Sequence, residues 1–217
     1  MSETNTFEGI ANVVGLMDRG GDVVAPGAFA DALPAFLRTG FIALSHDWEA
    51  LPVAMPEAAE ERPDGLWVRG AYHSTPAAEA AKAVVAERLA RGLTVGLSIG
   101  FQVEPTDTFA FRSGAELLTY ARRRGMTGLD EAGIEAWPDR CRLVLRVAEL
   151  FEVSIVAVPM NPGSGVLPNP EPLVPSPLAR SAARTSPHGE RRRALLIDFE
   201  RAKLRFLRTR LTEPWHA

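Results

Sequence analysis

The sequence has few of the residues and segments that indicate disulfides, membranes or metals. Cys141 is the only cysteine, which excludes an intramolecular disulfide and is typical of a cytosolic protein. No apolar run approaches the roughly 20 residues that span a bilayer, and the first residues, MSETNTFEG, lack the basic and apolar regions of a signal peptide. Neither a metal-ligand spacing nor a glycine-rich phosphate loop occurs. We therefore expect a cytosolic protein with no membrane partner, no metal and no cofactor.

Charge is distributed unevenly along the 217 residues. The formal net charge is −3, but residues 190–217 carry +4, so residues 1–189 carry −7. The overall composition, 46% hydrophobic and 24% charged, is typical of one globular domain with appendages. The sequence therefore predicts an acidic body followed by a basic tail.

Residues 93–101, Leu-Thr-Val-Gly-Leu-Ser-Ile-Gly-Phe, are the segment around which the chain is organised. Ser98 is the only hydroxyl between Gly96 and Gly100. A strand residue between two glycines is open to close approach by another backbone, which suits a nucleophile that attacks a peptide carbonyl. Taken alone, the segment is more typical of a buried serine in a strand kinked by glycine.

The same residues satisfy Gly-x-Ser-x-Gly, the nucleophile elbow of the α/β-hydrolases. That motif requires a strand, a sharp turn and a helix, with the catalytic His later in the chain. Here the strand pattern continues to Pro105, and the later histidines, His188 and His216, lie in a Pro-rich segment and next to the C-terminus. The elbow interpretation fails on this context, so a base for Ser98 has to lie upstream.

His46 is the stronger candidate for that base. It follows residues 41–44, four consecutive apolar residues that predict a strand buried on both faces. A histidine at the end of a buried strand is held firmly and still reaches a cleft, as a general base requires. A solvated or strand-capping histidine remains the alternative. His73 competes, but the alternation of residues 66–73 places it with Trp67, Arg69 and Ala71 on a more polar, solvent-facing side.

Glu152 is a carboxylate inside the apolar sequence Leu-Phe-Glu-Val-Ser-Ile-Val. We expect residues 142–158 to form a strand throughout, with Glu152 and Ser154 on one face. A carboxylate is costly to bury unless it is paired, and an imidazole held by a hydrogen bond is a natural partner. The alternative is a glutamate that points outward from a half-exposed strand.

The remaining patterns predict further elements around these residues. Strands are expected near residues 7–17, 53–55 and 66–72, the last two joined by an acidic turn at 57–65. Thr75-Pro76 is a helix start, and the Ala-rich helix ends before Gly92. Residues 106–140 are interpreted as an insertion between core strands, with one helix at 114–124. Asp18 and Asp22 are interpreted as turn formers.

Five blocks of the sequence, taken in order, resemble the HK97-type phage prohead proteases. They are Asp22 with Pro26-Gly27-Ala28-Phe29; Ser45-His46-Asp47; Gly65-Leu66; Leu97-Ser98-Ile99-Gly100-Phe101; and Glu152-Val153-Ser154-Ile155-Val156 with Pro159-Met160-Asn161-Pro162. The resemblance covers roughly residues 7–165. Residues 106–140 depart from it, because a short turn is expected in their place.

The family is distantly similar to the herpesvirus assemblins. The resemblance therefore implies a mainly β fold, a β-barrel with peripheral helices. It also implies a serine endopeptidase of capsid maturation, packaged in the procapsid in the bacterial cytoplasm. It would cleave the major capsid protein and its scaffold segment, and also itself. Ser98 matches the family nucleophile and His46 its base, and Glu152 falls where the third, orienting member is expected. A non-catalytic assembly or scaffold protein with the same fold is the alternative, and a homo-oligomer is left open.

The domain organisation follows from this resemblance and from composition. We expect a protease domain at 1–165, a Pro-rich linker at 166–189 and a basic amphipathic helical tail at 190–217. The tail is expected either to dock on scaffold or capsid protein or to pack on the barrel. A nucleic-acid partner is not favoured, because no basic patch interleaved with aromatic residues supports it.

Overall fold

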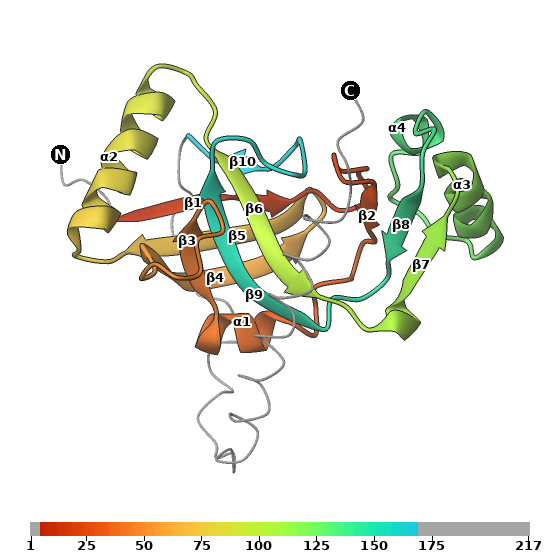
Figure 1. Ribbon diagram of the computed structural model, residues 1–217, viewed down its shortest axis with the longest axis horizontal. Helices are drawn as coiled ribbons and strands as arrows, with labels where there is room; N and C mark the ends of the chain where they lie inside the picture. Colours follow the sequence, from red (N-terminus) through yellow and green to blue (C-terminus); the bar gives the residue numbers. More distant parts are fainter. Residues whose placement is uncertain (1–4, 169–217) are drawn as a thin grey trace, which may run out of the picture. The chain divides into compact units, whose positions relative to one another are not determined.

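The computed structural model describes residues 5–168, and its secondary structure is mainly β (Figure 1). In chain order the elements are β1 (Thr6–Asn12), β2 (Asp22–Val24), α1 (Leu33–Thr39), β3 (Phe41–Leu44), β4 (Ala54–Arg62), β5 (Gly65–Tyr72), α2 (Pro76–Ala90), β6 (Gly96–Gln102), the 3₁₀ turn η1 (Pro105–Asp107), β7 (Thr108–Phe111), α3 (Gly114–Arg123), α4 (Glu131–Glu135), β8 (Cys141–Val144), β9 (Glu149–Val156) and β10 (Gly165–Val166).

Seven strands form the main sheet, in the order β10-β1-β5-β4-β3-β9-β6. All neighbours are antiparallel except β3 and β9, which are parallel. The sheet curls until its two ends meet. There the N–H of Val166 in β10 donates to the carbonyl of Val95, just before β6, at 2.9 Å. A Cβ added to Gly9 in β1 would lie 2.4 Å from Leu97 Cδ1 in β6. The result is a nearly closed, barrel-like sheet with peripheral helices, which confirms the predicted fold class.

Helix α2 agrees with its sequence prediction at both ends. The Thr75 hydroxyl accepts from the N–H of Ala78 at 3.3 Å, and Pro76 occupies the first turn. Gly92, at φ +69°, follows the helix in the left-handed conformation that glycine adopts without strain. The chain then enters β6 after three more residues. The short connection fixes where β6 begins.

A second, three-stranded sheet has the order β2-β8-β7 and packs with α3 and α4 around its own apolar cluster. It lies at the right of Figure 1, and residues 106–140 contribute β7 and both helices. The prediction of one continuous strand over 142–158 is wrong. β8 belongs to the small sheet and β9 to the barrel, since the N–H groups of Val147 and Ala148 bond to Ala28 and Gln102 and carry the chain from one sheet to the other.

The predicted acidic turn at 57–65 is also wrong. β4 continues through the acidic residues to Arg62 and pairs along its length with β5, leaving only Pro63 and Asp64 in the turn. The charged side chains are accommodated because β4 has an accessible face. One of them, Glu61, accepts hydrogen bonds from the backbone N–H groups of Gly27 and Phe29.

Strand β5 is buried on both faces, so the solvent-facing side predicted for Trp67, Arg69 and Ala71 is wrong. Arg69 can be buried because it forms an ion pair with a residue of the adjacent strand β1. Arg69 stands opposite Glu8 of β1, and its guanidinium contacts the Glu8 carboxylate. Each charge is compensated by the other, which permits both to be buried.

Replacing Arg69 with methionine should destabilise the fold by about 3–5 kcal/mol, because the fully buried Glu8 loses the guanidinium that compensates its charge. Urea denaturation measures the change, with Arg38→Met on the exposed end of α1 as the control. The double variant Arg69→Met/Glu8→Leu should recover much of the loss. An Arg69→Met protein as stable as the control would contradict the pair's importance.

Residues 169–217 contain most of the predicted linker and the whole predicted helical tail, and they lie outside the described residues. Within 5–168, no helix is both long enough and apolar enough to cross a bilayer.

Candidate active site

Three adjacent strands carry the three predicted site residues. His46 follows β3, Glu152 lies in β9 and Ser98 lies in β6, and these strands are neighbours in the order β3-β9-β6. On the antiparallel β6–β9 ladder, Ser98 is opposite Ser154 and Gly100 is opposite Glu152. Residues directly opposite one another, and residues two apart on one strand, point to the same face of a sheet. Ser98, Ser154 and Glu152 therefore share one face.

His46 is held in a tight turn at the end of β3. Ser45 and His46 have φ values of 52° and 58°, and the N–H of Asp47 bonds to the carbonyl of Leu44 at 2.9 Å. Left-handed conformations at two successive non-glycine residues cost energy and persist only where the surroundings impose them. The N–H of Ser45 bonds to Ile155 and that of His46 to the Ser154 hydroxyl, at 3.0 Å each, so β9 imposes the turn.

The structure brings His46 and Glu152 into direct contact. Nδ1 of His46 meets Oε1 of Glu152, and the other carboxylate oxygen accepts from the Ser154 hydroxyl at 2.6 Å. An ionised carboxylate only accepts hydrogen bonds, so Nδ1 carries the proton and Nε2 is left as an acceptor. The Glu152 side chain is fully buried, whereas the His46 side chain is 35% exposed. The imidazole is thus fixed on one side and accessible on the other.

Ser98 is buried, with 6% of its surface exposed, one strand away from this pair. Within residues 5–168 its hydroxyl forms no hydrogen bond, to His46 or to any other group. Its cross-strand partner is Ser154, whose hydroxyl accepts from the backbone N–H of His46. The Cβ atoms of such cross-strand partners are about 4.5–5.5 Å apart. Hydrogen bonds of a catalytic serine are often long in the free enzyme and shorten with substrate.

The expectation that Gly96 and Gly100 leave Ser98 open to another backbone is wrong. A Cβ on Gly100 would lie 2.8 Å from Glu152 Oε1 and 3.2 Å from Trp48 Cζ2. A Cβ on Gly96 would lie 2.7 Å from Pro159 Cδ. The missing side chains make room for the protein's own residues, and at Gly100 for the buried carboxylate that contacts His46.

The competing histidine lies elsewhere. His73 follows β5, where its N–H bonds to the carbonyl of Val53, and it is half-buried rather than solvent-facing. β5 has β1 and β4 as neighbours, so two strands separate it from β9. His73 is not among the groups bonded to Glu152.

Of the two aspartates predicted to form the turn before β2, Asp18 does so, whereas Asp22 is the first residue of β2 and its side chain pairs with Arg142 of β8. Asp18 accepts from the N–H groups of Gly20 and Asp22, each at 2.8 Å. Burial raises the pKa of Asp18 to about 6, with a further rise from Asp22 and an opposing effect of the backbone N–H groups. Among residues 5–168, no group of three or more His, Cys, Asp or Glu side chains is arranged to hold a metal ion.

Ser154 joins His46 and Glu152 in one hydrogen-bonded group, which the sequence did not predict. It was placed on the face of Glu152, but nothing in the pattern indicated that one hydroxyl would donate to the carboxylate and accept from the His46 backbone. The parallel pairing of β3 with β9 creates this link by placing the end of β3 beside Ser154. Strand order of this kind is not encoded in local periodicity.

Residues 1–171 match the caudovirus prohead serine protease family. The chain belongs to this family. The prohead protease of Enterobacteria phage HK97 is 36% identical over 101 residues, which make up 46% of this chain and 44% of that protein. The match therefore spans less than half of the relative's length.

Among solved structures, the KSHV protease in complex with a hexapeptide phosphonate inhibitor is similar, with a TM-score of 0.42 and 14% identity. The alignment covers 75% of this chain and 63% of that one.

Proposed function

We propose that the chain is a serine endopeptidase in which Ser98 is the nucleophile, His46 the general base and Glu152 the residue that orients the base. The observation that carries the proposal is the contact of a fully buried Glu152 with His46 on the face of the sheet that also holds Ser98. Membership in the prohead serine protease family supports the same chemistry.

In this mechanism Nε2 of His46 takes the proton of the Ser98 hydroxyl as its oxygen attacks the peptide carbonyl. The proton then passes from His46 to the leaving amine, the C–N bond breaks and an acyl-enzyme forms. Water, deprotonated by the same imidazole, releases the acyl group and restores the serine. Glu152 keeps the proton on Nδ1 and stabilises the imidazolium that forms in each half of the cycle.

The strand that bears Ser98 also has an edge suited to a peptide. β6 is the last strand of the main sheet, and within the described residues its only ladder partner is β9. Beyond Val95, whose carbonyl accepts from the N–H of Val166, the outer N–H and C=O groups of β6 suit an extended substrate segment, which would add as a further strand and bring its carbonyl to Ser98.

We further propose that the substrates are the major capsid protein, its scaffold segment and the enzyme itself, and that cleavage takes place inside the procapsid in the bacterial cytoplasm. The prohead protease of phage HK97 supports a role in prohead maturation. Self-cleavage is proposed for residues 169–189, which follow β10 and whose Pro- and Ala-rich composition suits an extended segment that enters a protease cleft readily.

Co-expression with the major capsid protein that is proposed as its substrate tests this function. Mass spectrometry of both proteins should show a shortened capsid protein, and a protease that ends within residues 169–189. An intact capsid protein would contradict the maturation role. A full-length protease together with a cleaved capsid protein would contradict self-cleavage but not the maturation role.

Replacing Glu152 with glutamine should lower kcat/KM roughly 10²- to 10³-fold. The amide oxygen can still face Nδ1, and the amide N–H₂ can face the Ser154 hydroxyl. The imidazole therefore keeps its tautomer, but the negative charge beside it is removed. The thermal midpoint and single-turnover rates separate this effect from unfolding. Wild-type activity in Glu152→Gln would leave Glu152 with a packing role only.

A further inference from the structure

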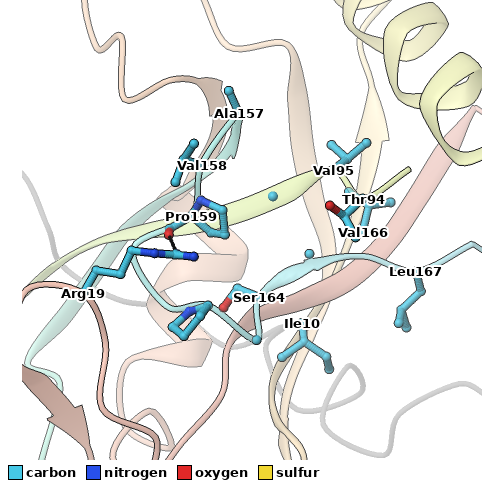
Figure 2. Close-up of a pocket in the computed structure, with 14 residues that line it drawn as sticks. Ile10, Arg19, Thr94, Val95, Ala157, Val158, Pro159, Ser164, Val166 and Leu167 are labelled. Atoms are coloured by element: carbon cyan, nitrogen blue, oxygen red, sulfur yellow. Dashed lines mark hydrogen bonds between the residues drawn. The ribbon is translucent and has the colours of Figure 1, made fainter. Parts of the chain in front are cut away.

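A pocket of about 450 Å³ lies beside the start of β6, and the mechanism above does not use it. Its wall comes from five places in the chain: Ile10 of β1, Arg19 of the β1–β2 connection, residues 94–96, the segment 157–159 after β9, and residues 162–167 through β10. Figure 2 shows these segments around one space, with the Arg19 side chain reaching toward Pro159. Its volume lies in the range of ligand-binding pockets.

The pocket reaches the strand of Ser98 at Gly96, two residues before the serine. Gly96 lines it, and Gly96 and Ser98 are two residues apart on one strand, so they share a face. Pro159 covers that face at Gly96, as Glu152 does at Gly100. Two strand residues span about 6.6 Å, so a peptide held at Ser98 would place a side chain in the pocket from within one or two residues of the scissile bond.

Arg19 gives the pocket a positive charge that no carboxylate within residues 5–168 pairs with. It is the only charged residue of the lining. Within residues 5–168 its guanidinium forms one hydrogen bond, to the carbonyl of Pro159. The nearby carboxylates are engaged elsewhere, Asp18 with its own turn and Asp22 with Arg142. Most of the five N–H donors of the guanidinium are therefore available to a ligand.

Ser164 supplies a second, independent observation. It lines the pocket and is 7% exposed, and its hydroxyl oxygen is buried with no hydrogen-bond partner in the described part of the chain. A buried hydroxyl without a partner is costly and calls for a ligand or water to satisfy it. The rest of the wall is largely apolar, with Ile10, Val95, Val158 and Val166 suited to the methylene groups of a side chain.

We propose that this pocket selects an acidic side chain, aspartate or glutamate, of the substrate near the scissile bond. Its carboxylate pairs with the Arg19 guanidinium and accepts from the Ser164 hydroxyl, and its methylene groups contact the apolar wall. This assignment rests on the proposed peptidase function. A lysine or arginine is repelled there, and a glutamine forms the weaker, uncharged hydrogen bonds.

The test uses the full-length protein and a random decapeptide library, amidated at the C-terminus so that only side chains supply carboxylates. Mass spectrometry of the products should show Asp or Glu favoured over Asn or Gln by about 10- to 100-fold at one position within two residues of the cut. Arg19→Gln should reduce that ratio to about one, and Arg19→Glu should shift the preference to Lys. Arg19→Lys should retain part of the preference, and Arg38→Gln, on exposed α1, should retain all of it.

A binding arm separates this proposal from the peptidase function. The same library is passed over immobilised Ser98→Ala protein, with and without Arg19→Gln. Enrichment of acidic peptides that requires Arg19 would support the pocket even if the wild type cleaved nothing, an outcome that would overturn the peptidase proposal alone. Cleavage with no acidic preference, or a preference that survives Arg19→Gln, would overturn the pocket assignment.

Discussion

Ser98→Ala is expected to abolish cleavage of capsid protein and of peptides, with a loss of roughly 10³- to 10⁶-fold in kcat/KM. The substitution removes the oxygen that would form the acyl-enzyme. It should leave the fold intact, because the Ser98 hydroxyl forms no hydrogen bond within the described residues and its loss leaves no donor or acceptor unpaired. The thermal midpoint should therefore stay within a few degrees of the wild type.

Ser154→Ala is the matched control, since Ser154 stands directly opposite on β9. Its hydroxyl donates to Glu152 and accepts from the N–H of His46, so its loss leaves two buried groups short of a partner. We expect Ser154→Ala to lower the free energy of unfolding by about 1–3 kcal/mol and to reduce kcat/KM without abolishing it. A fluorophosphonate probe should label the wild type and Ser154→Ala at residue 98, as located by tryptic mass spectrometry. Residual turnover above about 1% in Ser98→Ala would rule out Ser98 as the nucleophile.

The sequence was informative about the site residues because each stood out from its surroundings. Glu152 was a lone carboxylate in an apolar strand, and the structure pairs it with His46, the partner that the cost of burial called for. The part that periodicity did not reveal is the route between them. His46 meets Glu152 because β3 runs parallel to β9, a pairing between residues more than 100 positions apart.

Two predictions about the fold that the structure overturns share a cause, because local chemistry alone does not decide which side chains are buried. The alternation of β5 predicts a solvent-facing side for Arg69, but the Glu8 carboxylate on the neighbouring strand β1 compensates its charge and permits its burial. The acidic residues of β4 were assigned to a turn by their charge, although β5 offered a full set of backbone hydrogen bonds. In both cases a partner on a neighbouring strand outweighed the local preference.

His46→Asn is expected to lower kcat/KM by at least roughly 10³-fold, because the proton of the nucleophile loses its acceptor. Asparagine is chosen because residue 46 has a φ of 58°, a conformation that asparagine tolerates better than alanine, so the turn at the end of β3 should persist. The hydrogen bond from the backbone N–H of residue 46 to the Ser154 hydroxyl is also independent of the side chain.

His73→Asn is the matched control and should retain activity close to the wild type, because His73 lies at the end of β5, which two strands separate from β9. The same peptide assay, run beside a thermal melt of each variant, distinguishes a lost base from a lost fold. If His73→Asn were inactive and His46→Asn active at equal stability, the base would be His73 and the contact of His46 with Glu152 would be structural. If activity is almost completely lost in His46→Asn and retained in His73→Asn, His46 is the base, and its contact with the buried Glu152 is what holds it toward Ser98.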